Sequence, residues 1–374
     1  MPAAFAAGTG AFEGAQITKI ADLDAVNKGV GAGNATAPFI DSIDWYGGNS
    51  TDESFFIFRY CTEPENCVIG TATPDGGLIQ SAFNPPAGYA NLSGAKVSPA
   101  GNALLFKAMH QSGREDLFTY FKGSTVMYQL TNGTAIGTYS WLADGNVTYS
   151  EPRAELTCLD GAACKNQQFS YSTKIWAIRP TGEKLRTIYE SPNTSIADYA
   201  VSPDGKKVAY VDFMGEPFDP KKLWRLSVFY SGSIKVLESN RDGDGYYSPS
   251  WTPDGSAILY GSVSQKPFAA RGNSTLGASG WLGLVGADGE ERGRMILGGN
   301  TEGRGAVPFG AAITHDGSRI IFAVNQDVEG DGIDGAGIYS MALAHPIPEF
   351  PFAAAIAAVP VAAAIAWFRL RWNR

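Results

Sequence analysis

The sequence predicts an all-β fold, a six-bladed β-propeller closed by an N-terminal strand and followed by a C-terminal transmembrane helix. Three observations lead to this expectation. A turn-plus-strand motif recurs five times, glycine and proline are abundant (45 and 21 of 374 residues), and the C-terminal region holds an uncharged apolar stretch. Glycine- and proline-rich chains with few helical apolar periods are typical of short strands joined by turns.

The recurring motif is clearest at Val201–Tyr210, V-S-P-D-G-K-K-V-A-Y. Proline fixes φ at the second turn position, aspartate hydrogen-bonds forward to the backbone, and glycine accepts a positive φ, so a tight turn leads into a β-branched and aromatic strand. Related turns begin at Ser98, Leu142, Thr252 and Thr314, and successive copies lie 44 to 62 residues apart. An internal repeat of this period is typical of propeller blades.

A second hairpin after each motif completes a blade of four strands. In the fourth unit it runs from Leu223–Phe229 through Tyr230–Ser233 to Ile234–Leu237. The second, third and fifth units carry similar hairpins around glycine-containing turns. The first unit lacks the Asp-Gly turn, but Ile40–Trp45 and Ser54–Tyr60 fit its inner strands, which makes six blades.

The sixth unit is one strand short, because nothing strand-like separates Ile338–Leu343 from the apolar tail. At the other end of the chain, Ala15–Leu23 is a spare segment with alternating character. Pairing the two segments would close the ring and remove two free sheet edges. We therefore expect an N-terminal strand in the last blade.

The S-P-D-G-x-x-V-A-Y pattern, with aromatic or small residues before it (Tyr199–Val201, Ser250–Trp251), resembles the WD-repeat-like propeller repeat of the TolB type. The resemblance covers residues 15–345. It implies the fold and says little about function. The copies depart from the pattern where Ala100 replaces aspartate, where His315 replaces proline, and where the third copy is shortened.

The four cysteines form two pairs with equal spacing, Cys61/Cys67 and Cys158/Cys164. This separation suits a disulfide across a hairpin rather than a metal site, with free buried thiols as the alternative. Residues 1–14 hold no complete signal peptide and are interpreted as a leader remnant or a disordered segment. Paired cysteines together with seven N-x-S/T sequons favour an exported glycoprotein. The sequons lie at Asn34, Asn49, Asn91, Asn132, Asn146, Asn193 and Asn273.

The tail Phe350–Phe368 carries no charge, and arginines follow it in residues 369–374. A helix of this length rises about 28 Å, enough to cross a hydrocarbon core, and the basic end places the propeller outside the cell. A buried C-terminal helix is the alternative. The expected organisation is a leader over 1–14, the propeller over 15–345, a linker over 346–349, a transmembrane helix over 350–368 and a cytoplasmic tail over 369–374.

Pro348, Glu349 and Phe350 resemble the Pro-Glu-Phe sorting signal of archaeal surface proteins, which also precedes an apolar stretch and a basic end. The resemblance implies an archaeosortase as a partner, which would cut near the motif and pass the chain to a lipid anchor. Pro351 stands where some relatives carry glycine.

The best ligand candidate is the acidic loop Asn325–Gly337. Hard oxygen ligands at short intervals suit calcium, although the spacing is not that of an EF-hand. A solvated acidic loop is the alternative, and Asn240–Gly245 is a shorter stretch of similar composition. The candidate calcium ligands are Asp327, Glu329, Asp331 and Asp334.

Recognised catalytic motifs are absent from the sequence: it has no H-E-x-x-H, no G-x-S-x-G, no P-loop and no dinucleotide-binding glycine pattern. Its histidines are His110, His315 and His345, and His110 could face the central funnel or lie on the surface. The net charge of −8 argues against a nucleic-acid partner.

We therefore expect a non-catalytic propeller, anchored at the cell surface, that binds a protein, glycan or envelope partner. A metal-dependent propeller enzyme of the lyase, hydrolase or lactonase type is the first alternative. A structural component of the cell envelope is the second.

Overall fold

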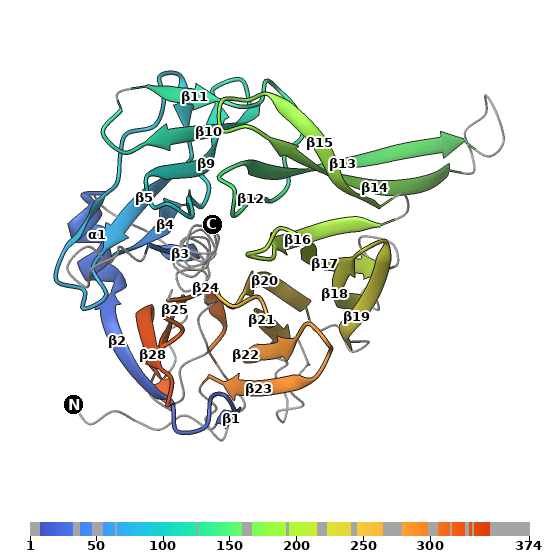
Figure 1. Ribbon diagram of the computed structural model, residues 1–374. Coiled ribbons are helices and arrows are strands. Elements are labelled where there is room, and N and C mark those ends of the chain that lie inside the picture. The colour runs from blue at the N-terminus through green and yellow to red at the C-terminus, as the bar shows by residue number, and fades with distance from the viewer. Residues whose placement is uncertain are drawn as a thin grey trace, which may run out of the picture.

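Six antiparallel sheets of four or five strands surround a central axis in the computed structural model (Figure 1). The expected propeller is therefore confirmed. The structure describes residues 8–344 apart from 33–37, 47–54, 64–65, 125, 159–166, 192–193, 215–222, 241–244, 265–278, 298–305, 315, 326–328 and 331–332.

The first three blades follow one another along the chain. Blade 1 contains β3 (Phe39–Tyr46), β4 (Phe55–Glu63), β5 (Asn66–Ala72) and β6 (Ile79–Ser81). Blade 2 contains β7 (Tyr89–Ala90), β8 (Lys96–Val97), β9 (Ala103–His110), β10 (Glu115–Phe121) and β11 (Met127–Gln129). Blade 3 contains β12 (Tyr139–Trp141), β13 (Val147–Cys158), β14 (Gln167–Ile178) and β15 (Lys184–Ser191).

The other three blades complete the ring, and two of them include N-terminal strands. Blade 4 contains β16 (Ser195–Val201), β17 (Lys207–Met214), β18 (Leu223–Tyr230) and β19 (Ser233–Asn240). Blade 5 contains β20 (Gly245–Trp251), β21 (Ala257–Ser264), β22 (Ser279–Gly286), β23 (Glu291–Ile296) and β1 (Gly8–Gly10). Blade 6 contains β24 (Pro308–Ile313), β25 (Arg319–Val324), β28 (Gly337–Ala342) and β2 (Gln16–Asp22). The small ribbon of β26 (Glu329–Gly330) and β27 (Ile333–Asp334) precedes β28.

The expected ring closure is present. β2 pairs antiparallel with β28, with Gln16 opposite Ala342 and Thr18 opposite Ser340. The N-terminal region goes further than expected, because β1 also pairs with β23 of blade 5. Phe12, between the two strands, is fully buried. Residues 8–14, which the sequence analysis left outside the propeller, therefore belong to the ring.

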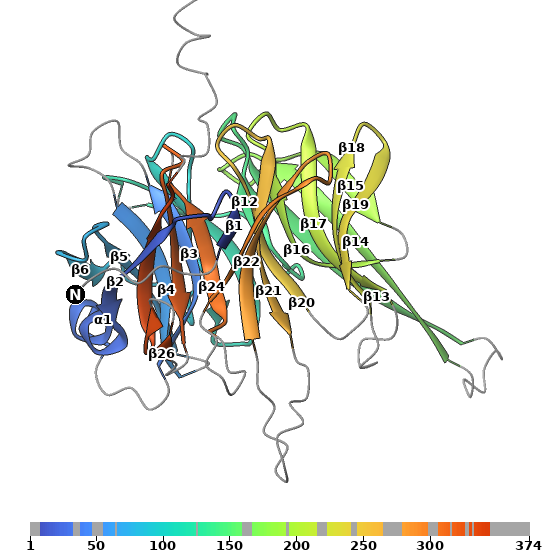
Figure 2. The same cartoon turned by 90° about the horizontal axis from the view of Figure 1, so that it is seen from below.

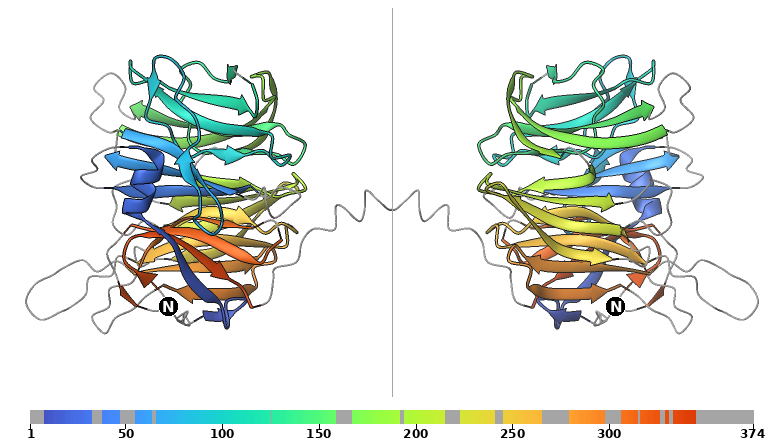
Figure 3. Two further views of the ribbon diagram at one scale, coloured as in Figure 1. Left: turned by 90° about the vertical axis from the view of Figure 1, so that its left-hand side faces the viewer. Right: turned by 90° about the vertical axis from the view of Figure 1, so that its right-hand side faces the viewer.

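The helix α1 (Leu23–Val30), which the sequence did not predict, links β2 to blade 1 and lies at the outer side of the ring (Figure 3). The Asp22 carboxylate caps its first turn by accepting from the Ala25 N–H at 2.7 Å. Gly31, with φ of 66°, ends it in the left-handed conformation. Val26 and Val30 are its buried residues and pack between blades 6 and 1.

The core of the described residues consists of six apolar clusters, one at each junction between neighbouring blades. Between blades 4 and 5, for example, Val211 and Leu226 pack in one cluster with Ile258 and Val285. Since neighbours cover both faces of every blade, a middle strand is apolar on both faces. This requirement explains runs such as Val208–Val211, which is buried throughout.

One hairpin extends beyond the ring. β13 and β14 have 12 residues each, and their pairs from Arg153–Ser172 to Cys158–Gln167 lie beyond the last contact with β15 at Thr173–Ser191. Figure 2 shows the hairpin projecting from blade 3.

The motif turns have the expected geometry. Gly205, Gly255 and Gly317 adopt φ of 71°, 67° and 65°. In the fifth blade, the Asp254 carboxylate accepts from the Thr252 hydroxyl at 2.6 Å and from the Ser256 N–H at 3.0 Å. Partial burial pushes the pKa of Asp254 up, but these hydrogen bonds outweigh it and hold the pKa below its ordinary value.

These turns predict a measurable acid dependence. Asp204 and Asp316 also have lowered pKa values, with the same opposing causes. A carboxyl whose folded pKa is depressed stabilises the fold above its unfolded pKa, and this contribution is lost as the pH falls through the folded pKa. Changing Asp204, Asp254 and Asp316 to Asn should therefore lower the melting temperature at pH 7 and flatten its decrease below about pH 4. Glu13→Gln, at an exposed position, is the control, and unchanged acid dependence in the triple variant would contradict the prediction.

Candidate functional site

The innermost strands of the blades line a central channel with a cavity of about 380 Å³. Side chains alternate along a strand, so residues two apart face the same side. In blades 2 to 6, one lining residue stands two positions before the first residue of each motif turn, and Asp44 has the corresponding place in blade 1; these residues are mostly small or hydroxyl-bearing. Around the ring they are Asp44, Lys96, Ser140, Ala200, Ser250 and Ala312.

Irregular backbone shapes the channel wall. The pairing register shifts beside Ser42, Asp198, Ser250 and Ala312, each on an innermost strand. Such bulges re-aim side chains. Gly310 has φ of 55°, and a Cβ there would lie 2.4 Å from the Ile43 amide nitrogen. Only glycine fits this contact between blades 6 and 1.

The two carboxylates of the channel join neighbouring blades. Asp44 of blade 1 accepts from the Val97 N–H of blade 2 at 2.7 Å. Asp198 of blade 4 accepts from the Ser248 N–H of blade 5 at 2.9 Å. Burial raises the pKa of both carboxyls, and the charge of Lys96 opposes this increase. The two carboxylates of the channel therefore help to hold neighbouring blades together.

Other contacts between blades strengthen the same wall. The Trp141 indole donates to the Lys96 carbonyl at 3.0 Å, and the Trp251 indole donates to the Ala200 carbonyl at 3.0 Å. In blade 6, Asn325 donates to the Ile40 carbonyl of blade 1 at 2.6 Å and accepts from its N–H at 2.7 Å. Asn325, the first residue of the predicted calcium loop, thus fastens blade 6 to blade 1.

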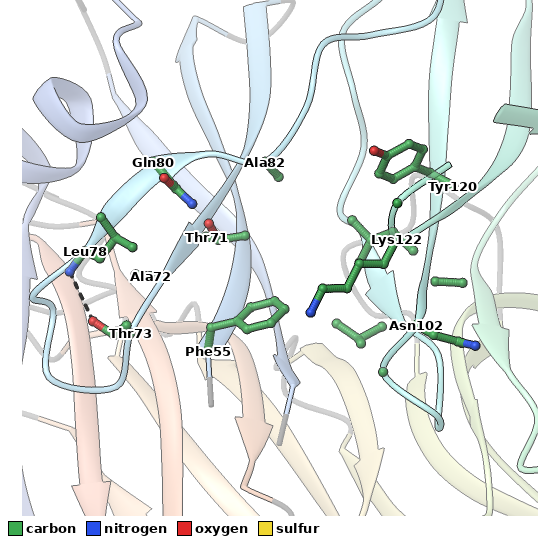
Figure 4. A pocket seen from close by; sticks show the side chains of 15 residues that line it. Phe55, Thr71, Ala72, Thr73, Leu78, Gln80, Ala82, Asn102, Tyr120 and Lys122 are labelled. Carbon is green, nitrogen blue, oxygen red and sulfur yellow. Dashed lines mark hydrogen bonds between the residues drawn. The ribbon is translucent and has the colours of Figure 1, made fainter. Parts of the chain in front are cut away.

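A second cavity, of about 500 Å³, lies between blades 1 and 2 and is called here the blade 1–2 groove. Figure 4 shows its walls, with β5 and the residues after it on one side and β9 and β10 on the other. Phe55, Leu78 and Ala82 supply apolar surface from blade 1, and Leu104 and Tyr120 supply it from blade 2. Leu78 is 55% exposed. A cavity of this size and composition suits a small molecule or a short segment of a partner.

The predicted calcium residues are only partly described. Asp327 and Asp331 lie outside the described residues, and of Glu329 only the backbone, in β26, is described. Asp334 is exposed at the end of β27. In the described parts of the chain, no group of three His, Cys, Asp or Glu side chains is arranged to hold a metal ion. Calcium binding by this loop stays a prediction.

The cysteine pairs have different outcomes. Cys61 and Cys67, opposite each other on β4 and β5, form the expected disulfide. Cys158 ends β13 at the tip of the projecting hairpin, but its side chain and Cys164 lie outside the described residues. The second bridge stays a prediction, which peptide mapping of the unreduced protein would test.

Three of the seven sequons lie on described residues. Asn132 is exposed. Asn91 is half-buried and accepts from Arg59 at 3.2 Å, and Asn146 is half-buried and donates to Asp144 at 2.9 Å. We therefore expect Asn132 to be the most accessible of these three to a glycosyltransferase. The sequons outside the described residues are Asn34, Asn49, Asn193 and Asn273.

His110 lies at the end of β9 and is not among the residues that line the channel. Its Nδ1 is 2.9 Å from the Ser112 hydroxyl, and its ring meets the edge of Tyr89. His315, His345, the sorting motif Pro348–Phe350 and the tail 350–374 lie outside the described residues. Within the described ranges, no helix has the length and apolarity needed to cross a membrane.

Comparisons with known proteins support the fold. No protein-family model and no curated protein matches the sequence. Among solved structures, an oligogalacturonate lyase in complex with manganese aligns with a TM-score of 0.50 and 14% identity, over 91% of this chain and 98% of its own. The likeness shows the fold. A gluconolactonase from Xanthomonas campestris aligns with a TM-score of 0.49 and 12% identity, over 92% of this chain and 97% of its own.

TolB from Acinetobacter baumannii aligns with a TM-score of 0.45 and 18% identity, over 71% of this chain. The alignment spans 55% of that TolB and, for a second TolB from Agrobacterium tumefaciens, 62% of its length. At identities this low, a shared fold does not imply a shared function.

The sequence predicted neither the channel nor the groove as a site, although Tyr199–Val201 and Ser250–Trp251, which precede two of the motif turns, line the channel. The sequence did contain one signal for the channel. Lys96 stands two positions before the motif turn that begins at Ser98, and Asp198 stands four positions before the one that begins at Ser202. Asp44 stands two positions before the place that such a turn would take in the first unit. For the groove no such signal exists, since Phe55 and Tyr120 belong to different blades and lie 65 positions apart in the sequence.

Proposed function

We propose that this chain is a non-catalytic β-propeller that binds a protein, glycan or envelope partner at the cell surface. The observation that carries this proposal is that the two carboxylates of the channel hydrogen-bond to the backbone of the neighbouring blade. Asp44 and Asp198 both accept backbone hydrogen bonds from the next blade. Carboxylates held in this way stabilise a rigid ring, and rigid rings serve as scaffolds for contacts made by their outer surfaces.

The groove supplies such an outer surface. It combines apolar walls with a few polar groups, and it lies at the junction of two blades, where both contribute side chains. The solved propellers named above include enzymes as well as TolB, so the fold does not select between binding and catalysis.

One experiment distinguishes a protein that only binds its ligand from an enzyme that changes it. The full-length chain would be immobilised and exposed to fractionated envelope glycans and proteins, and the bound material analysed by mass spectrometry. We expect saturable, reversible binding with the ligand recovered chemically unchanged. Recovery of a cleaved or rearranged ligand would favour the metal-dependent enzyme, and the absence of saturable binding to every fraction would favour a structural envelope role.

We also propose that residues 350–368 anchor the chain in a membrane, with the arginines of residues 369–374 on the cytoplasmic side. The support is the uncharged length of the segment and its basic end. Mass spectrometry of the mature C-terminus separates two forms of the anchor. An intact Arg374 indicates a plain transmembrane span, and a lipid-modified end near Pro348–Phe350 indicates sorting by cleavage. Full-length protein in the soluble cytoplasmic fraction would contradict both.

A further inference from the structure

The described lining of the blade 1–2 groove carries a positive charge, although the chain as a whole is acidic. The chain has a net charge of −8, yet neither aspartate nor glutamate occurs among the described residues that line the groove. Lys122 is the one charged side chain in that lining. Among these described lining residues, an anion that enters the groove therefore meets one positive charge and no carboxylate.

The position of Lys122 suits contact with a ligand. Its backbone N–H donates to the Asn102 carbonyl at 2.8 Å, which fixes the start of the turn after β10. Figure 4 shows its side chain extending from blade 2 toward blade 1, into the space that Phe55 also faces. Within the described residues, its ammonium group forms no ion pair or hydrogen bond. Among the described residues, no group therefore competes with a bound molecule for this charge.

Tyr120 adds a second polar group beside the apolar walls. Its ring stacks on Phe83 at 5.7 Å between ring centres, which holds the ring in place. In Figure 4 its hydroxyl points from blade 2 toward Ala82 of blade 1. A tyrosine hydroxyl can donate to a carboxylate.

We propose that the blade 1–2 groove binds a small amphipathic carboxylate. Its apolar body packs against Phe55, Leu104 and Ala82, and its carboxylate pairs with the ammonium group of Lys122. This inference rests on the proposed binding function and adds to it the location of the site and the chemical class of the ligand.

A matched pair of probes tests the inference. Naphthylacetate and naphthylacetamide have the same aromatic body and nearly the same shape, and they differ in charge. Binding of both to the full-length protein would be measured by equilibrium dialysis with fluorescence detection. We expect the carboxylate to bind roughly threefold to fivefold more tightly than the amide, the range of an exposed charge pair, and the preference to weaken as salt is added.

Four variants test whether the groove is the source of the preference for the carboxylate probe over the amide probe. Lys122→Met keeps the apolar stem and should remove the preference, while Lys122→Arg should retain it. Lys206→Met, an exposed lysine in the motif turn of blade 4, is the matched control and should leave the preference unchanged. Gln80→Trp, at an exposed position of the groove wall, should block both probes. Because these side chains are exposed, we expect all four variants to melt as the parent protein does.

The outcomes separate this inference from the proposed function. Equal binding of the two probes, or a preference that survives Lys122→Met, would overturn the assignment to a carboxylate. Absence of binding by both probes would overturn the groove as the site, while saturable binding of an envelope fraction would still support the proposed function. Probe binding that follows Lys122, together with a chemically altered envelope ligand, would keep the groove and overturn the non-catalytic function.

Discussion

Deleting residues 1–24 is expected to prevent stable folding of the whole ring. The deletion removes β1 and β2, which pair with β23 and β28, and it exposes the edges of two blades. It also removes Phe12 and Ile17, which are 0% and 3% exposed and pack in the cluster between blades 5 and 6. Loss of one buried phenylalanine side chain costs about 3–5 kcal/mol, and the total stability of a domain is about 5–15 kcal/mol. The combined loss should therefore exceed what the ring can tolerate.

Thermal unfolding followed by circular dichroism tests this expectation. Deletion of residues 1–7 alone, which leaves β1 and β2 intact, is the control and should lower the melting temperature far less. Phe12→Ala gives a graded version and should lose about 3–5 kcal/mol without removing a strand. A chain lacking residues 1–24 that melts like the intact protein would show that β2 does not close the ring.

The second large effect is expected from Arg225→Met. Arg225 and Asp212 stand opposite each other on β18 and β17 and form a two-point ion pair, with one contact of 3.0 Å between Nε and Oδ1. The side chains are 22% and 1% exposed. Removing the guanidinium leaves a buried carboxylate without its partner, and such a loss typically destabilises a protein by about 3–5 kcal/mol.

The pH dependence of this variant has a definite sign. Burial raises the pKa of Asp212 even beside Arg225, which opposes the increase. Without the arginine the folded pKa should rise further, so the folded state prefers the protonated carboxyl. Stability linked to a raised carboxyl pKa is present at low pH and is lost as the pH rises through the folded pKa. The deficit of Arg225→Met should therefore be larger at pH 7 than at pH 4.

Denaturant unfolding at the two pH values measures this difference. The double variant Arg225→Met with Asp212→Leu removes the buried charge as well and should recover much of the lost stability. A single variant within about 1 kcal/mol of the parent at pH 7 would mean that the pair is weakly coupled, as surface pairs are.

Local chemistry explains why the sequence predicted the blades. The turn at Ser202–Lys206 depends on five adjacent residues, since the Asp204 carboxylate accepts from the Ser202 hydroxyl and the Lys206 N–H, and Gly205 supplies the positive φ. Related turns form wherever the motif recurs, so its five copies identified five blades, and the strands expected at Ile40–Trp45 and Ser54–Tyr60 supplied the sixth. The missing strand after Ile338–Leu343 then predicted the partner of β2, because an open ring leaves two unpaired edges.

The remaining features depend on contacts between segments that are distant in the chain. Nothing local to Gly8–Gly10 indicates a strand, and β1 forms because β23 offers an edge to pair with. Likewise, α1 is only eight residues long, and its two buried valines need the surface between blades 6 and 1. The channel and the groove arise in the same way. Asp198 meets Ser248, and Phe55 and Tyr120 line one groove, only once their neighbouring blades have packed together. Turn geometry is a property of a few neighbouring residues, whereas a binding surface between blades is a property of their packing, and packing is not encoded in any single stretch of the chain.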